Sequence, residues 1–248
     1  MYLENLQVAD KIMKKIFDIE KVLIILKKEL NLFFNSPIAY IVISIFLLLL
    51  GFFYSRPLFV QNYATLRHVF DVIPLFFLFF IPAVTMRLYS EEYKSGTIEV
   101  IFTLPLRKSE ILLAKYLSAV CVIFISIILT FLYPLTLLFF GKFDIGQTIA
   151  GYIGVLLLVI FFSSIGVFSS SLTKNQIVSF VISFAIMFIF FILGKLGIFV
   201  SPTIAYIGID PHYDNFVRGI VDVRDIVYFL SLTALFLYFT YLSTTTEK

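Results

Sequence analysis

The sequence is poor in the residue types on which most soluble enzymes depend. Its 248 residues include one cysteine, two histidines and no tryptophan. The single cysteine, Cys121, excludes an internal disulfide and a multi-cysteine metal cluster. Charged residues make up 14% of the chain, against about 25% in a typical soluble domain. These shortages indicate that the chain has no resident cofactor or metal and is not a soluble globular protein.

Sequence motifs of several enzyme classes are missing as well. No G-x-x-x-x-G-K-[ST] phosphate loop occurs, and there is no G-x-S-x-G nucleophile elbow. His68 and His212, with nearby aspartates, include residue types that can bind a metal ion. We expect both histidines to be solvated loop residues instead. The net charge of +3 is too small and too dispersed to indicate nucleic-acid binding. We expect a protein that is not an enzyme and has no ATPase site of its own.

Apolar residues make up 60% of the chain, and the mean hydropathy is +1.02. They form six runs long enough to cross a hydrocarbon core of about 30 Å as helices. The runs do not alternate as transmembrane strands do. The sequence therefore predicts an all-α integral membrane protein with six transmembrane helices. The predicted spans are 38–54, 69–86, 116–140, 149–168, 177–200 and 226–242 within a transmembrane domain at 38–242, followed by a tail at 243–248.

The first 37 residues are predicted to form a cytoplasmic segment. Its N-terminus lacks the pattern of a signal peptide, so the first span is expected to direct its own insertion. Residues 11–34 have the spacing of an amphipathic helix, which Asn35, Ser36 and Pro37 end. We expect this helix to lie at the membrane surface, where lysines bind anionic headgroups; a soluble helix packed on a partner is the alternative. Its predicted apolar face consists of Ile12, Ile16, Ile19, Leu23, Leu26, Leu30 and Phe33.

The distribution of Lys and Arg predicts the orientation. With the N-terminus inside, the inner segments carry thirteen of these residues and the outer side carries six. Because cytoplasmic loops are enriched in Lys and Arg, both termini and residues 87–115 are expected to be cytoplasmic.

Residues 87–115 form the longest charge-rich interval between two apolar spans. Within it, residues 95–97 favour a helix start and Pro105 ends the helix. Ile98, Ile101 and Phe102 share one face of this short helix, which nothing in its own loop would cover. Glu91 and Glu92 stand beside it as carboxylates without an evident partner. A helix lying on the lipid surface is the alternative.

The same loop carries a family resemblance. It reads E-E-x-x-x-G-T-x-E-x-x-x-x-x-P from Glu91 to Pro105, with Lys115 ten residues later, and resembles the first cytoplasmic loop of ABC-2 type transporter permeases. The resemblance implies that residues 96–104 form a coupling helix that docks on an ATP-binding subunit. The docking residues would be Glu91, Glu92, Gly96, Thr97, Ile98, Glu99, Ile101, Phe102 and Pro105.

Further stretches resemble one branch of that family, which includes the gliding-motility and nitrous-oxide-reductase-maturation permeases. They are residues 27–30, 36–40, 170–176 and 210–228, so that the resemblance extends over roughly residues 20–242. It implies the permease subunit of an ATP-driven exporter in the bacterial inner membrane. The implied partners are a separate ATP-binding subunit, a second permease half (an identical copy or a sister permease) and membrane lipids.

A secondary transporter or channel-like protein without an ATPase partner is the alternative function. Against it, the spans carry few charges at mid-membrane depth and show no inverted repeat in their hydropathy. Asp71, near the outer end of the second span, is a candidate for the substrate path, although it lies close enough to the boundary to be solvated. On the outer segment, Asn215, Arg218 and Asp222 are expected to form a gating cap; a mobile loop is the alternative.

Overall fold

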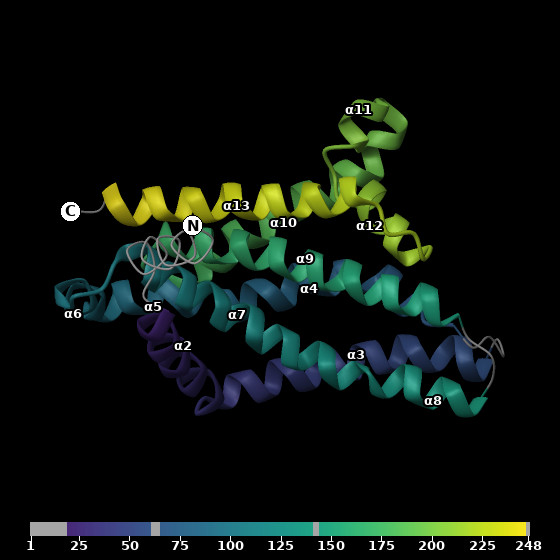
Figure 1. Ribbon diagram of the computed structural model, residues 1–248, viewed down its shortest axis with the longest axis horizontal. Coiled ribbons are helices and arrows are strands. Elements are labelled where there is room, and N and C mark those ends of the chain that lie inside the picture. Colours follow the sequence, from purple (N-terminus) through teal and green to yellow (C-terminus); the bar gives the residue numbers. More distant parts are fainter. Residues whose placement is uncertain (1–18, 61–64, 141–143, 247–248) are drawn as a thin grey trace, which may run out of the picture.

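The computed structural model describes residues 19–60, 65–140 and 144–246, and the elements in these ranges are all helices (Figure 1). Ile12 and Ile16 of the predicted amphipathic face lie outside the described residues. The helices are α2 (Ile19–Phe34), α3 (Pro37–Val60), α4 (Arg67–Thr85), α5 (Arg87–Ser95), α6 (Thr97–Thr103), α7 (Lys108–Thr130), α8 (Leu132–Phe140), α9 (Ile145–Ser171), α10 (Gln176–Val200), α11 (Pro202–Ala205), α12 (Asp210–Val217) and α13 (Val223–Thr246).

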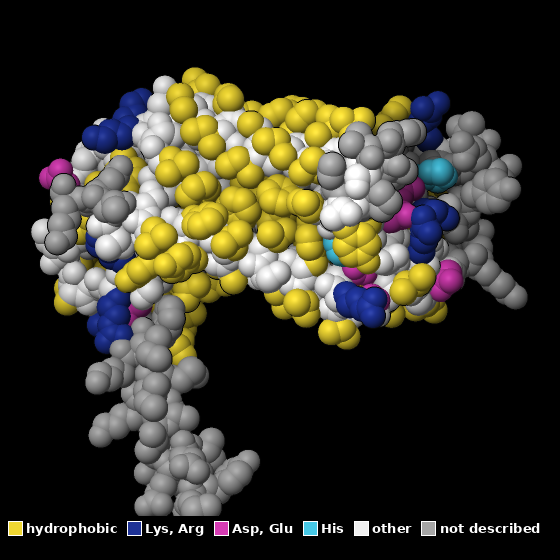
Figure 2. All heavy atoms as spheres, turned by 90° about the horizontal axis from the view of Figure 1, so that it is seen from above, with side chains coloured by type: hydrophobic (Ala, Val, Ile, Leu, Met, Phe, Trp, Pro, Cys, Tyr) yellow, Lys and Arg dark blue, Asp and Glu magenta, His cyan; other side chains and the backbone are white. Residues whose placement is uncertain are grey.

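Among the described residues, six helical rods are long and apolar enough to cross a membrane, which confirms the all-α fold with six candidate spans. The second rod joins α4 to α5, and the third joins α7 to α8. Figure 2 shows a band of apolar side chains around the middle of the visible face, with charged side chains at both ends. The six rods are Ala39–Arg56, Arg67–Ser95, Lys108–Leu137, Ile145–Ser171, Gln176–Gly197 and Val223–Thr245.

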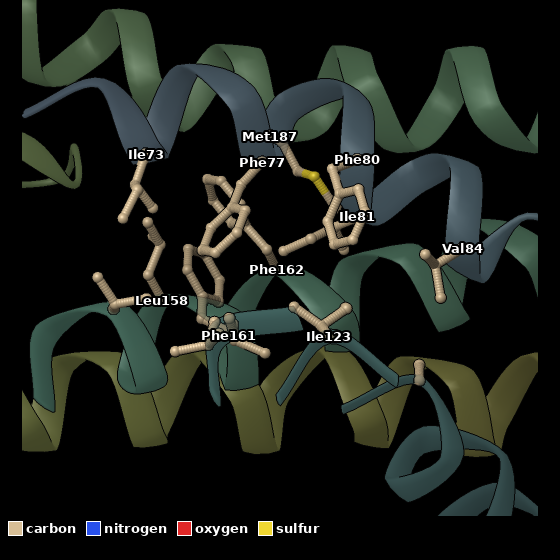
Figure 3. Packing of buried hydrophobic residues seen from close by; sticks show 14 of the residues in the cluster. Ile73, Phe77, Phe80, Ile81, Val84, Ile123, Leu158, Phe161, Phe162 and Met187 are labelled. Atoms are coloured by element: carbon tan, nitrogen blue, oxygen red, sulfur yellow. The ribbon is translucent and has the colours of Figure 1, made fainter. Parts of the chain in front are cut away.

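The central rod is α9, which packs against α4, α5, α7, α10, α12 and α13. Its Phe161 and Phe162 are fully buried and meet Phe77 of α4 in the core (Figure 3). Toward its C-terminus α9 carries small residues, and a Cβ added at Gly166 would lie 2.1 Å from Thr85 Oγ1. These small residues allow α4 to approach α9 closely.

At two of the prolines inside the rods, Pro74 and Pro134, a tyrosine compensates for the lost helical hydrogen bond. Proline has no N–H, so the carbonyl four residues earlier loses its helical partner. Pro74 frees the carbonyl of Phe70, which accepts a 2.9 Å hydrogen bond from the hydroxyl of Tyr213. Pro134 similarly frees the carbonyl of Thr130, which accepts a 3.1 Å bond from the hydroxyl of Tyr152. Both freed carbonyls are thereby satisfied by tyrosines of neighbouring helices, as hydrocarbon surroundings require.

A third interruption separates α4 from α5 at Met86. The backbone N–H groups of Tyr89 and Ser90 donate to Ser170 Oγ on α9, at 2.9 and 3.2 Å. The same hydroxyl donates to the carbonyl of Met86 at 3.0 Å. Ser170 therefore caps the first turn of α5 from another helix.

The helix that precedes the first span has a different inward face from the one expected. In α2 the buried residues are Val22, Glu29 and Phe33, whereas Ile19 and Leu23 are exposed. The predicted face is therefore only partly correct, because a carboxylate occupies the centre of the buried side. The exposed apolar residues leave contact with the membrane surface as a prediction.

Candidate docking site and its charged support

The short helix α6 is set off from α5 by a left-handed residue. Gly96 has φ 74°, a conformation that glycine adopts without strain, and it ends α5 and begins α6. At the other end Leu104 is extended, and Pro105 follows. The short helix thus lies close to the predicted bounds.

The apolar face of α6 points the other way from the prediction. Ile98 is buried at 6% exposure, and Phe102 is half-buried with the ammonium group of Lys108 5.1 Å from its ring centroid. Ile101 is also half-buried. These residues pack inward because α6 folds back on α5 and the core. The expectation that nothing in its own loop would cover this face is wrong, because α5 of the same loop contacts α6 and Ile98 is buried.

The exposed apolar residues of this segment are ones that the sequence analysis did not select. Val100 is 64% exposed and Leu104 is 49% exposed. Among the selected residues, Gly96, Thr97, Glu99 and Pro105 are exposed. The carbonyl of Pro105 accepts a 3.3 Å hydrogen bond from the ammonium group of Lys21 on α2.

A groove of about 330 Å³ lies between α2, α5 and α6. Its walls combine apolar side chains with both signs of charge, and four residues of the predicted site contribute to it: Glu91, Glu92, Thr97 and Ile101. The lining residues are Lys28, Glu29, Leu32, Phe33, Arg87, Leu88, Glu91, Glu92, Ser95, Thr97, Val100 and Ile101.

Beneath this groove lies a buried ion cluster, in which Lys115 of α7 is 1% exposed. Its ammonium nitrogen lies 2.8 Å from Glu92 Oε2 on α5 and 3.1 Å from Glu29 Oε1 on α2. It also donates to the carbonyl of Leu88 at 2.6 Å. Lys28 Nζ lies 3.3 Å from the other oxygen of Glu92.

These contacts correct the sequence-based view of the two glutamates. Glu92 is not unpaired: it is buried and forms ion pairs with two lysines, Lys28 and Lys115. Glu91 is exposed and pairs with Arg87 one turn earlier, at 3.5 Å. Charges taken out of water are expensive unless opposite charges and hydrogen bonds compensate them. The cluster therefore requires α2, α5 and α7 to keep their relative positions.

Sequence reasoning did not identify this cluster. Glu29 is separated from Lys115 by 86 residues, and Lys115 stands where a loop meets a span, as an ordinary interfacial lysine would. Both residues occur in stretches that carry the family resemblance. Their shared place in the family resemblance was the one hint in the sequence that both residues matter. It does not indicate that the two side chains are in contact.

At the far end of the molecule, the three predicted gating residues do not form one cluster. Asn215 donates to Asp225 Oδ2 at 2.9 Å, and Arg218 pairs with Asp214. The carboxylate of Asp222 accepts from the backbone N–H of Arg224 at 2.9 Å, which caps the start of α13. Their joint role in gating stays a prediction.

The view of His212 as a solvated loop residue is wrong. It is 4% exposed, and its Nδ1 lies 2.6 Å from Asp225 Oδ1, with Asp225 itself 3% exposed. The other histidine, His68, is exposed. Within the described residues, no group of three or more His, Cys, Asp or Glu side chains is arranged to hold a metal ion.

Asp71 is exposed at the rim of a cavity of about 500 Å³ between α4, α10 and α12. Across the cavity, Lys195 Nζ lies 3.1 Å from Asp210 Oδ2. Burial raises the pKa of Asp210, and the hydrogen bond and charge of Lys195 oppose that rise. Polar and apolar groups therefore meet here, at the end of the molecule opposite α6.

Comparison with known families identifies what kind of chain this is. The model of a family described as ABC-2 family transporter protein matches residues 53–247. A comparison with curated proteins finds no match. The matched region includes α6, Lys115 and all of α9, whereas α2 precedes it. The chain therefore belongs to the ABC-2 transporter family and is a multi-pass membrane protein of the permease type.

Proposed function

We propose that this chain is the permease subunit of an ATP-driven exporter, and that α6 is the surface on which a separate ATP-binding subunit docks. The family supports this assignment, because its permeases work with an ATP-binding partner. The observation that carries it is the exposure of Val100 on α6 and of Leu104 directly after it, in a segment that projects beyond the spans (Figure 1).

The chemistry of the surface indicates the chemistry of the partner. Val100 and Leu104 supply apolar area, while Glu91 and Glu99 are exposed beside them. A partner with an apolar groove and a basic rim complements both features. Ile98 and Phe102 act from beneath by holding α6 on α5, and Gly96 supplies the turn between the two helices.

The ion cluster transmits the partner's movement into the membrane. A push on α6 reaches α5 through Gly96, and Lys115 ties α5 to α2 and α7. Because α5 continues from α4, the displacement enters the second and third spans together. A second permease half, identical or a sister chain, completes the transporter in the bacterial inner membrane, with α6 on the cytoplasmic side.

The test is co-purification of the ATP-binding subunit with Val100→Asp/Leu104→Asp. Burying a large aliphatic side chain contributes about 1.5–3 kcal/mol, so we expect the double variant to lose affinity by roughly tenfold or more. The matched control is Val221→Asp, which places the same charge at a 49% exposed apolar position at the opposite end. Stoichiometric retention of the ATP-binding subunit by the double variant would overturn the docking assignment.

A further inference from the structure

The end of the molecule opposite α6 is held together by a buried histidine–aspartate pair. His212 lies on α12, and Asp225 lies in the first turn of α13. Besides its 2.6 Å contact with Asp225, the His212 ring places Nε2 3.0 Å from the carbonyl oxygen of Tyr206. The ring of Tyr228 stacks on the imidazole at 3.9 Å between centroids.

Hydrogen-bond accounting determines how many protons this pair needs. An ionised carboxylate and a backbone carbonyl are both acceptors only, so both ring nitrogens must donate. A neutral imidazole has one N–H and would leave a nitrogen lone pair facing an oxygen. The second carboxylate oxygen of Asp225 is already engaged by Asn215. With Asp225 ionised, the observed contacts therefore require hydrogen on both ring nitrogens, which is one proton more than a neutral His212 carries.

Other charged groups around α12 lie on its opposite face. Asp210 and Asp214 are each two residues from His212 and line the cavity with Asp71 of α4 and Lys195 of α10. On the side of α9, the polar contact with α12 comes from an uncharged residue: the amide of Gln147 donates to the carbonyl of Val217 at 2.8 Å. From α13, Asp225 meets the imidazole directly, while Arg224 is exposed.

The pair closes a small assembly around the start of α12. Tyr228 donates to the carbonyl of Ile207 at 2.6 Å, and His212 binds the preceding carbonyl of Tyr206. Gly208 packs so closely on α10 that an added Cβ would lie 2.0 Å from the nitrogen of Gly194. The same helix α12 carries Tyr213, the residue that satisfies the carbonyl freed by Pro74.

We propose that His212 and Asp225 form a proton-dependent clamp that fastens residues 206–217 to α13. With the extra proton bound, every polar atom of the clamp has its partner. When the proton leaves, one ring nitrogen faces an acceptor without a hydrogen between them, and α12 loosens. Loosening α12 withdraws Tyr213 from the Phe70 carbonyl of α4. The clamp is a conformational device that does not depend on the docking assignment.

The first test is the protonation state of the imidazole. The chain has only two histidines, so in full-length protein in lipid nanodiscs with labelled histidine, His68→Asn leaves His212 as the only imidazole signal. We expect both ring nitrogens of His212 to carry hydrogen. The comparison variant is Asp225→Asn, whose amide can donate to Nδ1 while its oxygen still accepts from Asn215. In that variant all bonds are satisfied by a neutral ring, and we expect hydrogen on Nε2 alone. A neutral His212 in the protein that retains Asp225 would overturn the proposal.

The second test asks whether the proton holds the clamp. Hydrogen exchange of residues 206–217 is compared between the His68→Asn protein and its Asp225→Asn derivative at each pH, so that the intrinsic pH dependence of exchange cancels. When the pH is raised until the imidazolium signal disappears, we expect residues 206–217 of the protein that retains Asp225 to open roughly tenfold more often than at low pH. We expect no such change in the Asp225→Asn derivative. Equal behaviour of the two proteins would contradict the clamp, and so would an imidazolium signal that persists at every pH at which the protein stays folded.

Discussion

The hydroxyl of Tyr213 on α12 donates a 2.9 Å hydrogen bond to the carbonyl oxygen of Phe70 on α4. Pro74, four residues after Phe70, has no N–H to offer that oxygen. The pair thus joins a short helix outside the spans to the carbonyl that Pro74 leaves without a partner in a candidate membrane-spanning helix. This relationship yields a prediction that tests whether the hydroxyl acts through that carbonyl.

Tyr213→Phe is expected to lower the free energy of unfolding by about 1–3 kcal/mol, because it leaves a buried carbonyl unsatisfied. In a Pro74→Ala background the alanine N–H binds Phe70, so the same change should have little effect. Thermal unfolding in detergent measures all four proteins of this cycle. Tyr238→Phe, at a 57% exposed position on α13, is the control. Equal losses in both backgrounds would show that the hydroxyl acts elsewhere.

Lys115→Met should destabilise the protein by about 3–5 kcal/mol, since Glu29 and Glu92 would lose their buried cation and keep only the half-exposed Lys28. Adding Glu29→Gln and Glu92→Gln removes both charges, and we expect this triple variant to regain most of the loss. Lys28 is half-exposed and stays solvated in both proteins. Chemical unfolding provides the comparison. A triple variant no more stable than Lys115→Met would mean that packing around Lys115, rather than charge, determines stability.

Two glycines should respond differently to substitution. Gly96→Ala meets no atom within 4 Å, so its effect is limited to the left-handed backbone, about 1–2 kcal/mol. Gly96→Asn should recover part of that loss, because asparagine tolerates the conformation. Gly166→Ala would push α9 away from Thr85, and Gly166→Asn should be worse. Expression and thermal stability of the four variants test this difference between the two positions. The prediction is contradicted if the asparagine variant is more stable than the alanine variant at both glycines.

The count of thirteen inner and six outer basic residues predicts how engineered cysteines react. In a Cys121→Ala background, Arg218→Cys should react with a membrane-impermeant thiol reagent in intact cells. Glu91→Cys should react only after the membrane is permeabilised. Both positions are more than half exposed, whereas Glu92 is buried and unsuitable. The opposite labelling pattern would reverse the orientation and remove α6 from the cytoplasm.

The sequence was sufficient to predict features that depend on length and on local breaks. The six spans follow from apolar runs, and the position of α6 follows from Gly96 and Pro105. The orientation of α6 could not be predicted, because apolar residues occur on more than one side of so short a helix. Which side is buried depends on how Gly96 folds it back on α5.

Pairings between distant residues were beyond sequence reasoning for a different reason. Nothing local distinguishes Lys115 from an interfacial lysine, or His212 from a loop histidine. Their burial depends on carboxylates supplied by other helices, Glu29 and Glu92 in one case and Asp225 in the other. A single sequence records the residue types, but not which of them meet in three dimensions.

The contact between Glu29 and Lys115 has a consequence for how the chain threads the bilayer. The first two rods lie between these residues, so the chain must cross an even number of times before they can meet. The same parity holds for Lys108, whose ammonium group donates to the carbonyl of Thr244 at 2.7 Å after four further rods. Together the two contacts place Ile19 and Thr245 on one side of the bilayer. A chain in which any single rod failed to insert could not form both contacts. The presence of both contacts therefore excludes a chain with one uninserted rod.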